Sequence, residues 1–155
     1  MPALLLLCLA VPRLPELPEP TTLKGHARDL SAITYSPDGK TLATASAEGV
    51  VKFWDAATLK EAGGFKTDKA LWSMAWRPDG KRIALGIGST VVVTDAAGKP
   101  LAKLEGHKGN VWNVVYDGKR LASACERGIV KVRDAETHKE LKELLIGHPP
   151  EEKYL

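Results

Sequence analysis

Residues 25–55 read GHARDLSAITYSPDGKTLATASAEGVVKFWD, and the rest of the chain is best understood by comparison with this stretch. Two short runs with strand-like alternation flank the turn sequence Ser-Pro-Asp-Gly at 36–39. A second turn at 47–49 leads into residues 50–54, which are rich in β-branched and aromatic side chains. The stretch therefore predicts three strands joined by two tight turns.

The pattern of this stretch returns twice with lower fidelity. Asp55, Asp95 and Asp134 end the successive copies, at intervals of 40 and 39 residues. Each copy is followed by a further strand-like run, so that one period holds four strands. A period near 40 residues with four strands predicts a repeat architecture in which each repeat is one small sheet.

A Gly-His pair, a Ser-Pro-Asp-Gly turn and a closing Trp-Asp pair, in this order and spacing, resemble the repeat unit of the WD-repeat β-propeller family. The resemblance covers about residues 21–148. It implies an all-β fold, a partial β-propeller of three four-stranded antiparallel blades at about 30–65, 70–104 and 111–146. We also expect an orphan outer strand at 21–24, which would belong to a further blade, and a tail at 149–155.

In this family a hydrogen-bonded set locks each blade, and it is made of a His, a Ser or Thr, an acidic residue and the Trp of Trp-Asp. The resemblance implies that the set in the first unit is His26, Thr44, Glu48 and Trp54, with Ser46 as the alternative to Thr44. A buried indole N–H and a buried imidazole need hydrogen-bond partners, so the expected role of these side chains is structural.

The other two units keep less of this set. The third unit has His107 and Ser123, but Arg127 and Arg133 stand where the acid and the Trp are expected. The second unit has no His, and Thr94 occupies the Trp position. We therefore expect the second and third blades to be looser than the first, or to depend on apolar packing alone.

A candidate contact surface lies where each copy's first strand begins. The resemblance implies that these strands line a central channel and that their starts lie toward the face on which the family often binds partners. Aromatic and Arg side chains are enriched in binding hot spots. The candidate partner-binding residues are Trp72 and Trp112, at equivalent positions, with Arg28, Asp29, Lys69 and Asn110 nearby. The alternative is that both indoles pack between adjacent blades, where large aromatic side chains bury most area.

Composition argues against several function classes. The chain has 155 residues, of which 44% are hydrophobic and 26% charged, with a net charge of +3. Basic and acidic residues alternate along it, so no segment has the one-sided positive field that nucleic acid or an anionic membrane needs. No Cys or His pair has metal-ligand spacing, and no phosphate loop or nucleophile elbow is present. We expect no enzyme activity, no metal, no cofactor and no nucleic-acid partner.

Residues 1–20 differ in composition from the repeats. The apolar run at 3–11 is shorter than the roughly 20 residues that a bilayer-spanning helix needs, so stable membrane insertion is not expected. It fits either a secretory signal cleaved after Ala10, although no basic residue precedes it, or an unstructured leader. Residues 12–20 are rich in Pro and predict an extended linker. A cytoplasmic and an exported location both stay open.

The resemblance implies a non-catalytic protein–protein interaction scaffold that offers a rigid surface to a protein or peptide partner. The alternatives are an accessory or sensory module of a larger enzyme or signalling system, and an exported binding protein. Propellers have about four to eight blades, so three blades cannot close a ring. We therefore expect either self-association that completes a ring as a homo-oligomer, or the rest of a longer propeller.

Overall fold

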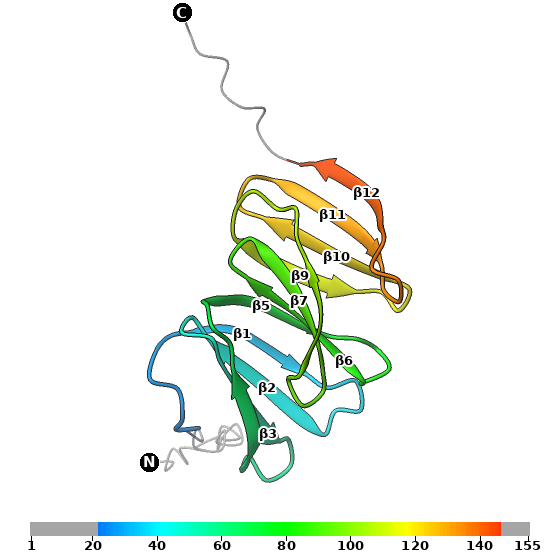
Figure 1. Cartoon of the computed structure of the whole chain (residues 1–155). Coiled ribbons are helices and arrows are strands. Elements are labelled where there is room, and N and C mark those ends of the chain that lie inside the picture. Colours follow the sequence, from blue (N-terminus) through cyan, green and yellow to red (C-terminus); the bar gives the residue numbers. More distant parts are fainter. Residues whose placement is uncertain (1–21, 147–155) are drawn as a thin grey trace, which may run out of the picture.

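The structure, a computed structural model, describes residues 22–146, which form twelve strands and no helix (Figure 1). Each set of four consecutive strands forms one antiparallel sheet, paired in chain order. The strands are β1 (Leu30–Tyr35), β2 (Thr41–Ser46), β3 (Val50–Asp55), β4 (Glu61–Lys66), β5 (Leu71–Trp76), β6 (Arg82–Ile87), β7 (Thr90–Asp95), β8 (Pro100–Leu104), β9 (Val111–Tyr116), β10 (Arg120–Cys125), β11 (Ile129–Asp134) and β12 (Glu140–Leu145). The predicted all-β partial propeller of three four-stranded blades is confirmed.

The Pro-Asp-Gly turns show how local sequence builds the first two blades. Gly39 has a φ of 71° and Gly80 a φ of 70°, a left-handed conformation that Gly adopts without steric cost. In each turn the glycine amide donates to the carbonyl oxygen three residues earlier, at 2.9 Å, in Ser36 and Arg77. The turn geometry fixes the register of each first and second strand, and with it the face on which every side chain lies.

Two expectations about the chain before and after the blades have different outcomes. Residues 22–24 form no strand, in contrast to the expected outer strand at 21–24. An outer strand forms hydrogen bonds only along a neighbouring strand, and the part of the chain described here offers none at this place. The expected leader and linker at 1–20, residue 21, the Gly147-His148 pair and the tail at 149–155 lie outside the described residues.

The hydrophobic core lies between the blades, not within them. We call the side of a blade that faces the following blade its forward face, and the opposite side its rear face. Small forward-facing residues such as Ala43 and Ala45 pack against larger rear-facing ones, such as Met74 and Leu85, in the next blade. A second cluster joins the second and third blades in the same way, through Ala84, Val91, Val93, Leu104, Val111, Val114 and Leu121.

The boundary between the second and third blades also carries polar contacts. The Val111 amide donates to the Gly88 carbonyl oxygen at 2.7 Å, and the buried Ser73 hydroxyl donates to the Val111 carbonyl oxygen at 3.2 Å. Gly86 is needed at this boundary, because a Cβ there would overlap Ser73 Oγ and the Val111 carbonyl oxygen. Arg77 of the second blade also forms an ion pair with Glu136 of the third at 2.5 Å. Two hydrogen bonds and this ion pair therefore reinforce the apolar contact.

Two blade faces have no neighbour in the part of the chain that is described. On the rear face of the first blade Ile33 is 64% exposed and Tyr35 58%, whereas the equivalent Met74 and Trp76 pack against the first blade. On the forward face of the third blade Val115 is 51% exposed. These two faces are the counterparts of the two surfaces that meet at each boundary inside the chain.

Candidate functional site

The expected locking set of the first blade centres on one hydroxyl. The indole Nε1 of Trp54 donates to Thr44 Oγ1 at 2.8 Å, and His26 Nε2 lies 2.8 Å from the same oxygen. Thr44 and Trp54 are both buried, and a hydroxyl can accept two hydrogen bonds and donate one, so it joins both rings. Thr44 takes this position instead of Ser46, whose buried hydroxyl has no partner among residues 22–146.

Glu48 does not join this set, although the sequence predicted that it would. His26 Nδ1 is buried without a hydrogen-bond partner in residues 22–146, and no hydrogen bond connects it to Glu48. Burial lowers the pKa of His26, the Lys52 ammonium lowers it further, and the Glu48 charge opposes these effects only weakly. The longer Glu side chain loses more rotamer freedom when fixed than an Asp does, which disfavours a fixed contact at this turn.

Arg133 replaces the missing Trp in the third blade. His107 Nε2 lies 2.8 Å from the buried Ser123 hydroxyl, as His26 does from Thr44. Arg133 donates to Ser123 Oγ through a long contact of 3.4 Å and to the Glu105 carbonyl oxygen at 2.8 Å. The guanidinium thus takes the donor role of the indole and also holds the segment before His107. The third blade was expected to be looser than the first or to depend on apolar packing alone, and the structure shows that it has a polar network of its own.

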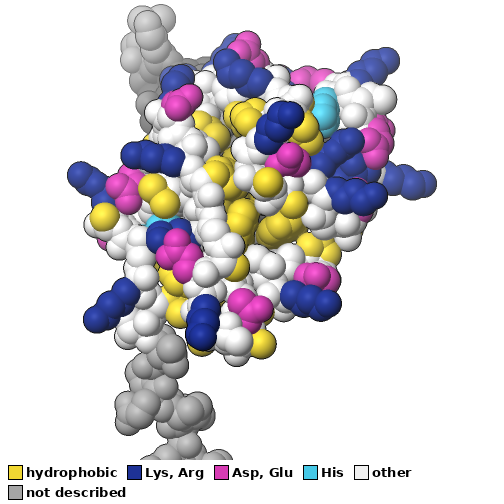
Figure 2. Space-filling view, turned by 60° about the horizontal axis from the view of Figure 1, so that its bottom comes forward, with side chains coloured by type: hydrophobic (Ala, Val, Ile, Leu, Met, Phe, Trp, Pro, Cys, Tyr) yellow, Lys and Arg dark blue, Asp and Glu magenta, His cyan; other side chains and the backbone are white. Residues whose placement is uncertain are grey.

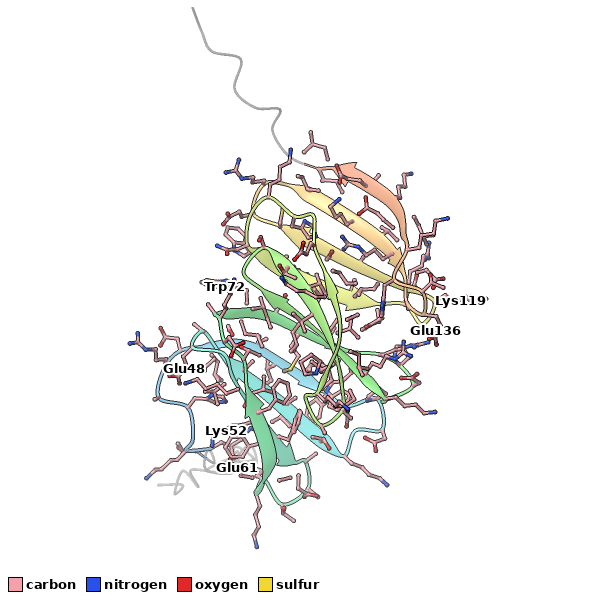
Figure 3. All side chains as sticks on the ribbon, in the orientation of Figure 1. Glu48, Lys52, Glu61, Trp72, Lys119 and Glu136 are labelled. Atoms are coloured by element: carbon pink, nitrogen blue, oxygen red, sulfur yellow. The ribbon has the colours of Figure 1, made fainter. Side chains whose placement is uncertain are left out.

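A charged cluster extends this network toward the outer strand β12. Lys131 is buried and pairs with Glu143 and with Glu140, whose Oε2 lies 3.0 Å from Lys131 Nζ. The hydrogen bond that the Lys131 ammonium donates to the Glu143 carboxylate is the main reason that the pKa of Lys131 is raised, so the ammonium stays charged. The first blade has a simpler version, in which Lys52 pairs with Glu61 at 2.6 Å (Figure 3).

The second blade has none of these contacts. Thr94, at the Trp position, donates to the carbonyl oxygen of the adjacent Asp95 at 2.9 Å. Leu85 stands at the position of Thr44 and Ser123, as the strand registers show. The blade is therefore held by apolar packing, through residues such as the fully buried Ile83 and Leu85.

The segment before the second blade carries no His. Only residues 67–70 separate β4 from β5, whereas residues 105–110 separate β8 from β9. Gly64 and Phe65, which align with the Gly-His pairs, lie inside β4 and pair with Lys52 and Val51. We call the segments 25–29, 67–70 and 105–110 the lead-in loops. Thr67 lies four residues before β5, as His26 and His107 lie four residues before β1 and β9, so a Thr stands where the other two loops have a His.

The six candidate partner-binding residues belong to the lead-in loops and the strand starts that follow them. The first strands β1, β5 and β9 are neighbours, so these loops lie close together. Arg28, Asp29 and Lys69 are exposed, and the half-buried Asn110 donates to Glu126 at 3.2 Å. Their role stays a prediction.

Trp72 and Trp112 occupy the same structural position in two blades. Each is the extra residue of a β-bulge at the start of its strand, between paired neighbours. Trp72 is 37% exposed and points outward, and Trp112 is 60% exposed (Figure 3). Neither indole is buried between blades, which was the alternative. A bulge adds twist and redirects a side chain, and the sequence gives no local sign of it.

Residues 22–146 contain no cluster of His, Cys, Asp and Glu that could hold a metal ion, and Cys125 is a buried free thiol. Within the same residues no helix is long and apolar enough to cross a membrane. The groups gathered at the lead-in loops are two indoles with an amide and charged side chains around them. Such groups suit contact with another molecule.

Comparison with known proteins decides the family. Residues 18–55 and 98–134 match the family "WD domain, G-beta repeat". The chain is a WD-repeat protein. The two matched segments include the first three strands of the first and third blades. The first three strands of the second blade, which lacks a locking set, fall between them. A good match thus accompanies the two blades that have a His-centred network.

Several WD-repeat proteins are similar to this chain. WD repeat-containing protein SL1-17 of Schistosoma mansoni is 32% identical over 73% of this chain and 39% of that protein. Human eukaryotic translation initiation factor 3 subunit I is 27% identical over 71% of this chain and 39% of its own length. The 66 kDa stress protein of Physarum polycephalum is 34% identical over 70% and 19%. This WD-repeat chain thus spans about two fifths or less of these relatives.

Solved structures support the fold. The structure of U3-55K aligns with a TM-score of 0.73 at 19% identity, over 81% of this chain and 42% of the other. The crystal structure of RRP9 WD40 repeats gives 0.72 at 20% identity, over 81% and 41%. At these identities the likeness extends to the WD-repeat fold alone.

Proposed function

We propose that this WD-repeat chain is a non-catalytic interaction module whose partner surface is formed by its lead-in loops. The observation that carries the proposal is the exposure of Trp72 and Trp112 at matching bulges of neighbouring strands. A Trp on a rigid sheet offers a large contact area and few rotatable bonds to immobilise. WD-repeat proteins generally act as protein-interaction scaffolds, which supports this reading.

Charge around the two indoles favours a polar protein or peptide partner. Arg28 and Lys69 contribute positive charge and Asp29 negative charge, and all three are exposed. A mixed rim around aromatic anchors is the usual anatomy of a protein interface, in which the rim gives specificity more than affinity. We expect the partner to bury both indoles and to pair with the rim charges.

Peptides selected from a random display library on the wild-type chain test this surface. Trp72→Ala and Trp112→Ala should each weaken the selected binders at least tenfold in fluorescence polarisation, because truncating an aromatic anchor costs about 2 kcal/mol or more. Leu141→Ala is the matched control, since Leu141 is exposed on β12, away from the loops. Binders that tolerate the double Trp variant as well as the control would refute the proposal.

We infer further that the two open blade faces are covered by a second copy of the chain. At each internal boundary a forward face of small and β-branched residues meets a rear face of larger ones. The forward face of the third blade continues this pattern with Ala122, Ala124 and Val130, and the rear face of the first with Ile33 and Tyr35. Two copies joined head to tail at both faces would present six blades in a ring.

Light scattering after size-exclusion chromatography measures this association directly. Head-to-tail pairing predicts the mass of two chains, and Ile33→Asp or Val115→Asp should return the mass to one, because each places a charge in the new boundary. Lys60→Asp, on an exposed loop of the first blade, is the control. A stable wild-type monomer would overturn self-association. Further blades of a longer chain would then be the remaining way to cover the two open blade faces.

A further inference from the structure

A groove of about 720 Å³ runs along the outer half of the second blade's rear face. Leu85, Val92 and Thr94 form part of its wall. Strand by strand, these residues are the equivalents of Thr44, Lys52 and Trp54 in the first blade, and of Ser123, Lys131 and Arg133 in the third. The groove therefore lies where the other two blades place their polar networks.

The second lead-in loop has no His to cover this place. In the first and third blades, hydrogen bonds from His26 and His107 tie the preceding segment down onto the rear face. In the second blade, the Thr67 amide donates to the carbonyl oxygen of Gly49 at 2.8 Å, and the Thr67 hydroxyl donates to that of Lys69 at 2.8 Å. The segment is thus held to the turn of the first blade and to itself, and it forms the opposite wall of the groove.

The lining combines an apolar wall with a basic rim. The half-buried Phe65 and Val92 supply the accessible apolar surface, and the buried Leu85 and Ile87 complete the wall. Phe65 continues into an aromatic row in which its ring centroid lies 5.9 Å from that of Phe53. Lys66, Lys69 and Lys103 border the groove, against one acid, Asp68. Within residues 22–146, Lys66 and Lys69 form no salt bridge, and Lys103 pairs with Glu105. Figure 2 shows hydrophobic side chains gathered on one face, with both basic and acidic side chains around them.

We propose that this groove binds an acidic peptide segment of a protein partner that brings one aromatic side chain. The carboxylates of the segment would face Lys66 and Lys69, which have no acidic partner of their own. The aromatic ring would extend the row formed by Phe65 and Phe53, as Trp54 fills the corresponding place in the first blade. The volume falls within the roughly 300–1,000 Å³ of ligand sites, and aromatic pairs add favourable contact beyond area burial.

This site goes beyond the lead-in surface proposed above and uses different residues, with Lys69 bordering both. The probe is a dye-labelled peptide, acetyl-Glu-Asp-Trp-Glu-Asp-amide, and its matched controls have Ala for Trp or Lys for each acid. Fluorescence polarisation on the full chain should show binding of the probe and at least tenfold weaker binding of both controls. Equal binding of the Ala control, or no binding of the probe at millimolar concentration, would overturn the proposal.

Two variants place the bound peptide in the groove. Lys66→Glu should weaken binding at least fivefold, whereas Lys60→Glu, an equal charge change on an exposed loop, should leave it within twofold. Thr94→Trp should abolish binding, because it places in the groove the side chain that the first blade has at the equivalent position, Trp54. If circular dichroism shows that Thr94→Trp is unfolded, the comparison of the two Lys variants decides alone. Equal affinity of Lys66→Glu and Lys60→Glu, or loss of binding in Trp72→Ala, would show that the peptide binds elsewhere.

Discussion

The first and second blades have the same strand order and the same Pro-Asp-Gly turn, yet different forces hold them. In the first, Thr44 joins an indole and an imidazole in a buried polar set. In the second, Leu85 takes the place of Thr44, and apolar packing replaces the set. The comparison teaches that the polar set is not needed to form a blade. What it adds is a fixed position for the segment that precedes the blade.

The largest effect on stability is expected in the second blade, where apolar packing takes the place of the buried polar set. Leu85→Ala removes a fully buried side chain from the boundary with the first blade and should cost about 2–5 kcal/mol in the free energy of unfolding. Urea denaturation followed by circular dichroism measures this cost. Leu141→Ala, on an exposed position of β12, should change stability by less than about 0.5 kcal/mol. Similar costs for both variants would mean that the second blade is already loose.

A smaller effect is expected when the hydroxyl of the first blade is removed. Thr44→Val keeps the volume but leaves the Trp54 indole N–H without an acceptor, which should cost about 1–3 kcal/mol. Thr94→Val is the matched change in the second blade, and it removes only a bond to the neighbouring Asp95 carbonyl. We expect its cost to be well below that of Thr44→Val in the same urea experiment. The reverse order would show that the polar set does not stabilise the first blade.

Replacing Arg133 by Trp tests whether the third blade can take the set of the first. The indole can donate to Ser123 as Trp54 donates to Thr44, so Arg133→Trp should stay within about 1 kcal/mol of wild type. Arg133→Ala loses the donors to Ser123 and Glu105 and should be the more destabilising of the two. Thermal unfolding of both variants ranks them. If Arg133→Trp is the less stable variant, the cluster of Lys131, Glu140 and Glu143 requires the guanidinium of Arg133.

The smallest expected effect is a pH dependence that belongs to the two blades with a His. Burial is the main cause that lowers the pKa of His26 and of His107. As pH falls through the unfolded value of about 6.5, the unfolded chain binds protons that the folded chain does not, so the free energy of unfolding decreases. His26→Gln and His107→Gln should each reduce this loss, measured as the change in urea midpoint between pH 7.5 and 5.5. If both variants lose as much stability at pH 5.5 as the wild type does, other titratable groups cause the pH dependence.

The all-β fold with three four-stranded antiparallel sheets could be predicted from the sequence, because turn glycines and the alternation of side chains are local properties. The repeat spacing identified Thr44 and Trp54 as equivalents of positions in the family. In the structure the Trp54 indole donates a hydrogen bond to the Thr44 hydroxyl. The same comparison could have suggested Arg133 as a substitute hydrogen-bond donor, because Arg133 stands at the Trp position. The outcome depended on where its long side chain would find acceptors, and that is a property of the packed structure.

The bulges at Trp72 and Trp112 and the groove of the second blade were not predictable in this way. A bulge depends on how two strands are paired, and neighbouring residues give no sign of that pairing. The groove depends on the absence of a His from the second lead-in loop and on the hydrogen bond that holds Thr67 to Gly49 of the first blade. Both are consequences of how segments far apart in sequence come to lie together.

The hydrogen bond from the Val111 amide to Gly88 has a consequence for how the protein opens. An amide at the start of a strand usually exchanges its hydrogen with solvent quickly, because strand ends fray. Here the acceptor belongs to a different sheet, and the bond breaks only when the second and third blades move apart. The exchange rate of this one amide hydrogen therefore measures how often two neighbouring blades separate while each remains folded.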